Sequence, residues 1–310
     1  MAKRRSFFSN AFGLLKQTGM EWLDDKAPQL GAALAYYTVF ALAPLVLLLL
    51  AIIGLLFRDD PSGAWTRVTE QMGYFLDRSA IQVVTDIAQD ASKPGKSTLA
   101  TVVGIALAIF GASGVFGQLQ DALNTIWGVK AKPGEGIISF LRARFVSFAM
   151  LGGVFFLLLV SLTVEALLKG FSHYVQQALP GGLAIALSVY LVFDFAVVTI
   201  LFAMIFKFLP DAEIQWRDVW IGAAMTAIFF GIGKWALGLY LGSGAAASAY
   251  GAASSLITLL LWIYYSSQIL LFGAEFTQVY ANQAGRRVEP SEHAVPIVTR
   301  EVEQTHPKKR

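Results

Sequence analysis

Cysteine is absent from this chain of 310 residues, and histidine occurs only three times. Without cysteine the protein has no disulfide bonds, no thiolate chemistry and no cysteine-ligated metal. His173, His293 and His306 are isolated in the sequence, so the clusters of histidine and carboxylate that hold metal ions are missing. We therefore expect neither a metal nor a cofactor.

Signatures of catalysis are also lacking. The sequence has neither the G-x-x-x-x-G-K-[ST] loop that binds phosphates nor the G-x-S-x-G turn that presents a serine nucleophile. We therefore do not expect an enzyme. The formal net charge of +3 is too small to favour nucleic acid, and the basic residues lie at the ends of apolar segments rather than in a stripe. Lipid headgroups are their expected partner.

Charge is scarce as well: 15% of the residues are charged and 56% are hydrophobic, whereas soluble domains carry about 25% charge. Apolar residues gather in six long runs, at 30–57, 99–116, 145–168, 183–208, 219–241 and 255–274. About 20 helical residues cross the hydrocarbon core of a bilayer, and a spanning segment must satisfy all of its backbone hydrogen bonds. The sequence thus predicts an all-α, polytopic membrane protein with a six-transmembrane-helix bundle and short amphipathic helices on both sides.

The remaining segments flank this bundle. Residues 1–28 have the apolar spacing of an amphipathic helix that lies in the headgroup region or, alternatively, packs on the bundle from the cytosol. The transmembrane domain is predicted at 29–284. It includes an external cap at about 58–97 with two short helices, one after Asp60-Pro61 and one from Ser79. Residues 285–310 are polar and rich in proline, which predicts a disordered cytoplasmic tail.

Basic residues predict how the chain is oriented. If both termini are cytoplasmic, the cytoplasmic segments hold 17 Lys and Arg residues and the external connections hold 6. Cytoplasmic loops carry an excess of Lys and Arg in multi-pass proteins. We therefore expect the amino and carboxyl termini in the cytoplasm.

Two ionisable residues lie inside predicted spans. Asp194 is close to the midplane of its span, and Lys234 is in the outer third of the next one. An ionised side chain at the bilayer centre costs at least about 2.5 kcal/mol, so it normally faces a partner or a hydrated cavity. We interpret both residues as parts of a polar path. The alternative is that Asp194 is protonated or bonded to a neighbouring helix and that Lys234 extends outward to the headgroups.

The last span carries a band of polar side chains at mid-depth, from Tyr264 to Gln268. Hydroxyl groups can bond to carbonyls of their own helix, so Gln268 is the member that most needs an external partner. We place Gln268 and Tyr264 on the predicted polar path with Asp194 and Lys234. In the first span Pro44 removes a backbone donor, which predicts a kink.

Several separated strings resemble the YihY/BrkB family of bacterial inner-membrane proteins over residues 20–284. They are Gly31-Ala32-Ala33-Leu34-Ala35-Tyr36-Tyr37, Ala43-Pro44, Leu123-Asn124-Thr125-Ile126-Trp127, Tyr250-Gly251, Leu261-Trp262-Ile263-Tyr264 and Gly273-Ala274-Glu275. Glu275 falls at the inner boundary of the last span, where the sequence predicts partial burial. The resemblance implies an inner-membrane location. It also connects the chain with a family once labelled ribonuclease BN, some of whose members are linked with lipid movement.

Two functions are compatible with these observations. The first is a permease or lipid-translocating protein with a polar intramembrane path and a lipid or small-solute substrate. The second is a non-transporting envelope-assembly or scaffold protein, in which the polar residues only hold helices together. Attack on RNA phosphates needs metal ligands or an acid and a base facing water, and no cytoplasmic segment is long enough to build such a site. We therefore do not expect ribonuclease activity.

Overall fold

A computed structural model describes residues 7–75, 78–92, 111, 114–132, 152–153, 157, 182–242, 254–286 and 288–297. This part of the chain is mostly helical. Its helices are α1 (Phe7–Asp24), α2 (Ala27–Leu56), α3 (Pro61–Phe75), α4 (Arg78–Ser92), α7 (Gly182–Phe208), α8 (Trp216–Gly242) and α10 (Ser254–Gln283), and residues 114–126 are also helical. Four short strands follow helix ends: β1 (Val129–Ala131), β2 (Ala212–Glu213), β3 (Glu289–Pro290) and β4 (Ala294–Pro296).

Three helical stretches are long and apolar enough to cross a membrane: Ser188–Phe208, Trp216–Leu239 and Leu256–Gln283. They coincide with the last three predicted spans, so a helical membrane protein is confirmed. The first predicted span falls on α2, which has 30 residues and no charged side chain. The runs at 99–116 and 145–168 lie mostly outside the described residues, so a bundle of six spans stays a prediction.

Helix α1 meets α2 at a sharp junction. Lys26 has φ of +54° there, the left-handed conformation, and Pro28 follows within the first turn of α2. Pro44 lies inside α2. A Cβ atom on Gly111 would lie 3.6 Å from Cγ of Pro44, so the backbone at residue 111 packs close to this point of α2.

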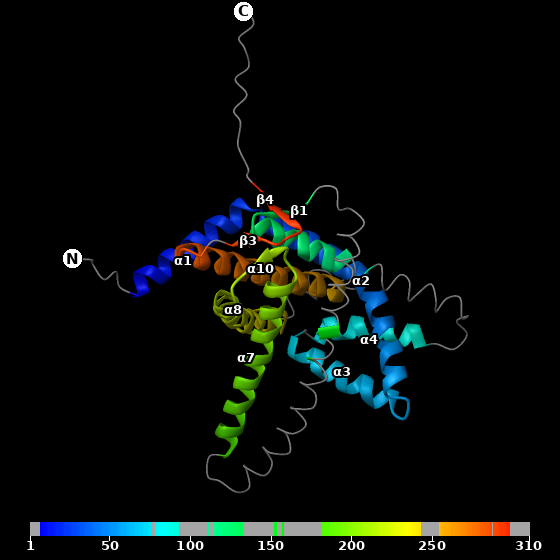
Figure 1. Cartoon of the computed structure of the whole chain (residues 1–310). Coiled ribbons are helices and arrows are strands. Elements are labelled where there is room, and N and C mark those ends of the chain that lie inside the picture. The colour runs from blue at the N-terminus through cyan, green and yellow to red at the C-terminus, as the bar shows by residue number, and fades with distance from the viewer. Residues whose placement is uncertain are drawn as a thin grey trace, which may run out of the picture.

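Helices α3 and α4 occupy the segment for which the sequence predicts two short external helices (Figure 1). Asp60 caps α3, since its carboxylate accepts a hydrogen bond from the backbone N–H of Gly63 at 2.8 Å. On α4, Val84 and Ala88 are buried against Val46 of α2. Helix α4 also contacts α10. We call this end of the molecule the cap end.

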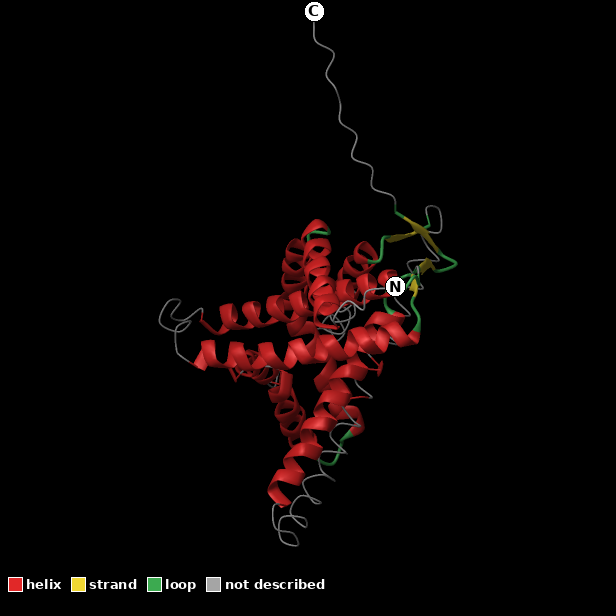
Figure 2. Ribbon diagram, turned by 90° about the vertical axis from the view of Figure 1, so that its left-hand side faces the viewer, coloured by secondary structure: helices red, strands yellow, loops and turns green. Residues whose placement is uncertain are grey.

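The strands gather on one side of the helices, which we call the strand end (Figure 2). Strand β1 pairs with β4, and β2 pairs with β3, both antiparallel. The strand end therefore joins three connections that are far apart in the sequence. The distribution of Lys and Arg predicts that these three segments lie on the same side of the membrane. The strand pairing is possible only if they do.

The strands correct the prediction of disorder for residues 288–297 of the predicted tail, whereas residues 298–310 lie outside the described residues. Residues 289–296 contain β3 and β4, and the backbone N–H of Ser291 donates to the carbonyl of Asp211 at 2.9 Å. The backbone N–H of Ile297 donates to the carbonyl of Gly128 at 2.7 Å. Proline content and mixed charge are properties of the segment alone, and they predict disorder. The segment is ordered because it pairs with residues that lie elsewhere in the chain.

Helices α7, α8 and α10 form the central packing together with α2 and residues 114–126. Close helix contacts depend on glycine. In membranes the hydrophobic effect does not drive helices together, so they associate through the close packing that small residues allow. A Cβ atom on Gly222 of α8 would lie 2.8 Å from Cβ of Thr277, and one on Gly273 of α10 would lie 2.8 Å from Cβ of Thr226. Each helix thus presents a glycine to a threonine of the other.

Candidate functional site

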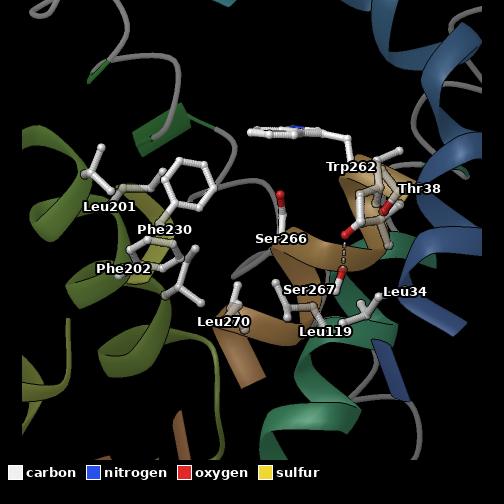
Figure 3. A pocket seen from close by; sticks show the side chains of 14 residues that line it. Leu34, Thr38, Leu119, Leu201, Phe202, Phe230, Trp262, Ser266, Ser267 and Leu270 are labelled. Atoms are coloured by element: carbon white, nitrogen blue, oxygen red, sulfur yellow. Dashed lines mark hydrogen bonds between the residues drawn. The ribbon is translucent and has the colours of Figure 1, made fainter. Parts of the chain in front are cut away.

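A cavity of about 300 Å³ lies where α2, residues 114–126, α7, α8 and α10 meet. We call it the central cavity. Most of its wall is hydrocarbon, and aromatic rings from α7, α8 and α10 lie on it, as Figure 3 shows. The lining residues are Leu34, Thr38, Val115, Leu119, Val198, Leu201, Phe202, Ile205, Phe230, Trp262, Ile263, Ser266, Ser267 and Leu270. None of them is ionisable.

The wall of the central cavity carries three hydroxyl groups, those of Thr38, Ser266 and Ser267. Ser267 donates to the carbonyl of Ile263 at 2.8 Å and is satisfied within its own helix. The Ser266 hydroxyl is buried and has no hydrogen-bond partner among the described residues. In Figure 3 it points toward the space between Trp262 and Phe230. A buried hydroxyl without a partner is costly, so Ser266 is the polar group most suited to a ligand in this cavity.

Asp194 and Lys234 lie one helical turn beyond the central cavity, away from the strand end. Asp194 precedes Val198 by four residues on α7, and Lys234 follows Phe230 by four residues on α8, so each shares a helix face with a lining residue. Both side chains are partly buried. They are close enough to attract each other electrostatically. The structure therefore brings together the two charged residues of the predicted path.

Gln268 and Tyr264 do not join them. Gln268 belongs to a second hollow, of about 530 Å³, between α1, α8 and α10, which we call the side groove. Its lining residues are Gly19, Trp22, Leu23, Phe229, Ile232, Tyr265, Gln268, Ile269 and Phe272. Tyr264 lines neither hollow. The polar band of the last span is thus divided between faces of α10, and a path through all four residues stays a prediction.

The Gln268 amide lies against α2. A Cβ atom on Gly31 would lie 3.0 Å from Cδ of Gln268, so only glycine at this position leaves room for the amide. Both amide atoms are buried without a hydrogen-bond partner among the described residues, and so is Nε1 of Trp22 in the same groove. The side groove therefore combines an apolar wall with unpaired polar atoms.

Asn124 fixes the strand end through Asp211. Its Nδ2 donates to the Asp211 carboxylate at 2.9 Å, and its Oδ1 accepts from the Asp211 backbone N–H at 2.8 Å. Gln120 donates to the same carboxylate at 3.2 Å. Burial, followed by the charge of Asp211, raises the pKa of Asp121, which lies on the same helical segment. Asn124 belongs to a family motif, but the sequence gives no signal for its partner 87 residues away.

A second anchor at this end is the pair Asp218 and Arg286. The guanidinium donates twice to the carboxylate, at 2.5 and 3.1 Å. Asp218 is 1% exposed and lies in the first turn of α8, where the helix dipole favours a negative charge. The hydrogen bond with Asp218 is the main cause that raises the pKa of Arg286. Arg286 lies in the segment predicted to be a disordered tail, so no sequence pattern pointed to this pair.

Glu275 is 0% exposed, which corrects the expectation of partial burial at the membrane boundary. It contacts Asp25 of the junction between α1 and α2. Burial raises the pKa of Asp25, a hydrogen bond with Glu275 opposes this rise, and the charges of Glu21 and Asp24 add to it. Carboxyl groups from two distant segments therefore meet inside the protein.

The other family-motif residues have mixed environments. Trp127 and Trp262 are buried, and Ala33 is partly buried on α2. Tyr36 and Tyr37 are 59% and 44% exposed, respectively, on α2. Tyr250 and Gly251 lie outside the described residues. Among the described residues, no group of three or more His, Cys, Asp or Glu side chains is arranged to hold a metal ion.

Together, the long apolar helices define an integral membrane protein of helical type, with two partly buried residues of opposite charge on neighbouring helices. Sequence comparison then identifies the family. The chain belongs to the family described as "Virulence factor BrkB", which matches residues 19–297. The resemblance to the YihY/BrkB family is therefore confirmed.

Individual relatives are bacterial proteins named UPF0761 membrane protein. The one from Pseudomonas paraeruginosa is 27% identical over 275 residues, which cover 87% of this chain and 63% of the relative. The one from Albidiferax ferrireducens is 29% identical over 262 residues, which cover 81% of this chain and 58% of the relative. The chain thus spans about three fifths of the length of these relatives. No solved structure matches it.

Proposed function

We propose that the protein is a permease or lipid-translocating protein of the bacterial inner membrane, and that the central cavity is its substrate site. The observation that carries this proposal is the position of the Asp194–Lys234 pair one turn beyond an uncharged, aromatic-lined cavity. Ligand sites combine a largely apolar wall with a few placed polar groups. A charge pair inside a membrane is also a default functional site.

The chemistry of the wall favours an amphipathic substrate. Hydrocarbon of the substrate would pack on Phe202, Phe230 and Trp262, while the Ser266 hydroxyl offers one hydrogen bond. A charged headgroup would exchange partners with Asp194 and Lys234. Each side chain already attracts the other electrostatically, so a zwitterionic or singly charged headgroup would replace one electrostatic attraction with another. Because no ionisable residue lines the cavity, we assign it no catalytic step.

Flux measurements on charge variants test this proposal. Purified protein would be reconstituted in vesicles of phosphatidylethanolamine and phosphatidylglycerol with trace NBD-labelled analogues, and dithionite quenching would report movement between leaflets. We expect Asp194→Asn and Lys234→Ala to lower the rate at least about tenfold, which is about 1.4 kcal/mol. Lys130→Ala, which removes an exposed lysine on β1, should leave it unchanged. Wild-type flux equal to that of protein-free vesicles would contradict the proposal.

A scaffold function is the second candidate, and the strand end favours it. Two anchors, Asn124 with Asp211 and Asp218 with Arg286, hold three connections in one assembly that has no role in the central cavity. Exchanging the charges as Asp194→Lys with Lys234→Asp separates the two functions. Under either function the exchanged variant should regain the thermal stability of the wild type. A scaffold should show no flux even in the wild type, whereas a translocating protein should show wild-type flux that the exchanged variant loses.

A further inference from the structure

The junction of α1 and α2 packs on α10 through two carboxyl groups. Glu275 of α10 is 0% exposed, and neither of its carboxyl oxygens receives a hydrogen bond from an N–H or O–H group of the described residues. Asp25 from the junction lies within hydrogen-bond contact of it. An ionised carboxylate without a donor or a cation is strongly disfavoured in a protein interior. Glu275 therefore requires a proton or a cation, because no N–H or O–H group of the described residues donates to its carboxyl oxygens.

The charged groups around this contact are acidic. Glu21 of α1 acts on Glu275 and Asp25, and Asp24 acts on Asp25. Lys26, the next residue along the chain, is exposed. From the other elements that pack on α10, Asp218 of α8 is held by Arg286, and Asp121 interacts with Asp211 and Lys130. Asp218 and Asp121 therefore interact with residues other than Glu275. None of the charged groups named here places a positive charge beside Glu275.

Two carboxyl groups in contact form a hydrogen bond only when one of them carries a proton. If both are ionised they repel each other, as in other carboxyl pairs that share a site. No group of three acidic or histidine side chains among the described residues is arranged for a metal ion. We propose that Asp25 and Glu275 are a proton-binding site, and that the shared proton fastens the junction of α1 and α2 to α10.

The site is built for exchange with solvent on one side. Asp25 is only partly buried, whereas Glu275 is buried completely, so a proton enters through Asp25. Burial raises the pKa of Asp25 above its ordinary value of 3.8. At pH values between 3.8 and the raised pKa, the folded protein binds more protons at this site than the unfolded chain does. The contribution of this contact to stability is complete at low pH and is lost as pH rises through the raised pKa.

Release of the proton has a defined structural consequence. Trp22 and Gly19 of α1 form one wall of the side groove, and Gln268 on the opposite wall precedes Glu275 by seven residues, or two turns of α10. Repulsion between the two carboxylates would move α1 away from α10 about Lys26, whose left-handed backbone marks the junction. The groove would then widen. This inference concerns the proton and α1, and it does not depend on the proposed transport.

Infrared spectroscopy tests for the proton directly. At neutral pH the wild type should show a protonated-carboxyl stretch, part of which disappears in Glu275→Gln and in Asp25→Asn. Glu213→Gln, which changes an exposed acid on β2, should leave the spectrum unchanged. If Glu275→Gln does not fold, Asp25→Asn carries the comparison. The same band in wild type and in both variants would overturn the proposal.

A distance measurement tests the fastening. Because the chain has no cysteine, spin labels can be placed on Met20→Cys of α1 and Asn282→Cys of α10, both at exposed positions. The distance between them should increase between neutral and alkaline pH in the otherwise wild-type protein. It should stay short in Glu275→Gln, whose amide donates to Asp25 without a proton. An equal increase in Glu275→Gln, no increase in the wild type, or a response to sodium against choline at constant pH would overturn the proposal.

Discussion

Thr226 of α8 occupies the space that a side chain on Gly273 of α10 would need. A Cβ atom on Gly273 would lie 2.8 Å from both Cβ and Cγ2 of Thr226 and closer still to its hydroxyl. That hydroxyl donates to the carbonyl of Gly222 at 2.7 Å, which fixes its rotamer. Gly222 is in turn covered by Thr277. The two helices therefore lock through reciprocal contacts of glycine with threonine.

The first prediction follows from this contact. Gly273→Ala should destabilise the protein by about 1 to 3 kcal/mol, the usual cost of overpacking a close-packed interior. Thermal unfolding in detergent measures this loss. Adding Thr226→Ala should restore part of it, because the hydroxyl and methyl groups nearest the new Cβ are removed. Gly231→Ala, at a position where no atom lies within 4 Å, should have little effect. An equal loss of stability in Gly273→Ala and Gly231→Ala would contradict the proposed contact.

The second prediction concerns Asn124 and Asp211. Asn124→Ala leaves the Asp211 backbone N–H without its acceptor, which should cost about 1 to 3 kcal/mol. Asn124→Asp should be worse at neutral pH, because it places a second carboxylate against Asp211, and should recover as pH falls and the new carboxyl is protonated. Thermal unfolding over a range of pH measures both effects. Thr125→Ala on the exposed side of the same turn is the control. A stable Asn124→Asp protein at neutral pH would argue against this geometry.

The third prediction concerns Asp218 and Arg286. Arg286→Ala leaves a carboxylate that is 1% exposed without its partner. Removing one partner of a buried pair leaves an uncompensated charge and destabilises the protein, although the 24% exposure of the Arg286 side chain moderates this loss. Arg286→Lys should recover only part, since lysine cannot donate from a planar fork. Adding Asp218→Asn to Arg286→Ala should also recover part of the lost stability, because it removes the unpaired buried charge. Protease cleavage after residue 285 reports detachment of the strands, and unchanged resistance in Arg286→Ala would contradict the assignment.

Local sequence signals predicted much of the helical fold. The runs at 183–208, 219–241 and 255–274 are apolar over a bilayer's width, and this property is contained in each segment alone. The depth of Asp194 and Lys234 follows from the rise of a helix, so their place within the spans was predictable. Their mutual attraction was not predictable, because it depends on how α7 and α8 face each other.

Long-range partners were beyond the sequence. Asn124 and Asp211 are 87 residues apart, and Asp218 and Arg286 are 68 apart, so no local pattern connects them. The division of the polar band has the same cause: Ser266 faces the central cavity and Gln268 the side groove because neighbouring helices cover different faces of α10. The interaction of Glu275 with Asp25 likewise joins α10 to a junction about 250 residues earlier in the sequence.

Filling the central cavity without touching a charge tests the proposed function most directly. Ser266→Phe would place a ring in a volume of about 300 Å³ while leaving Asp194 and Lys234 in place. Ile228→Phe adds a ring of the same size at a position on α8 that is 47% exposed. We predict that leaflet-to-leaflet movement of NBD-labelled phospholipid falls at least about tenfold with Ser266→Phe and is unchanged with Ile228→Phe, both proteins remaining folded. Equal movement in Ser266→Phe and wild type would contradict the assignment of this cavity as the substrate site.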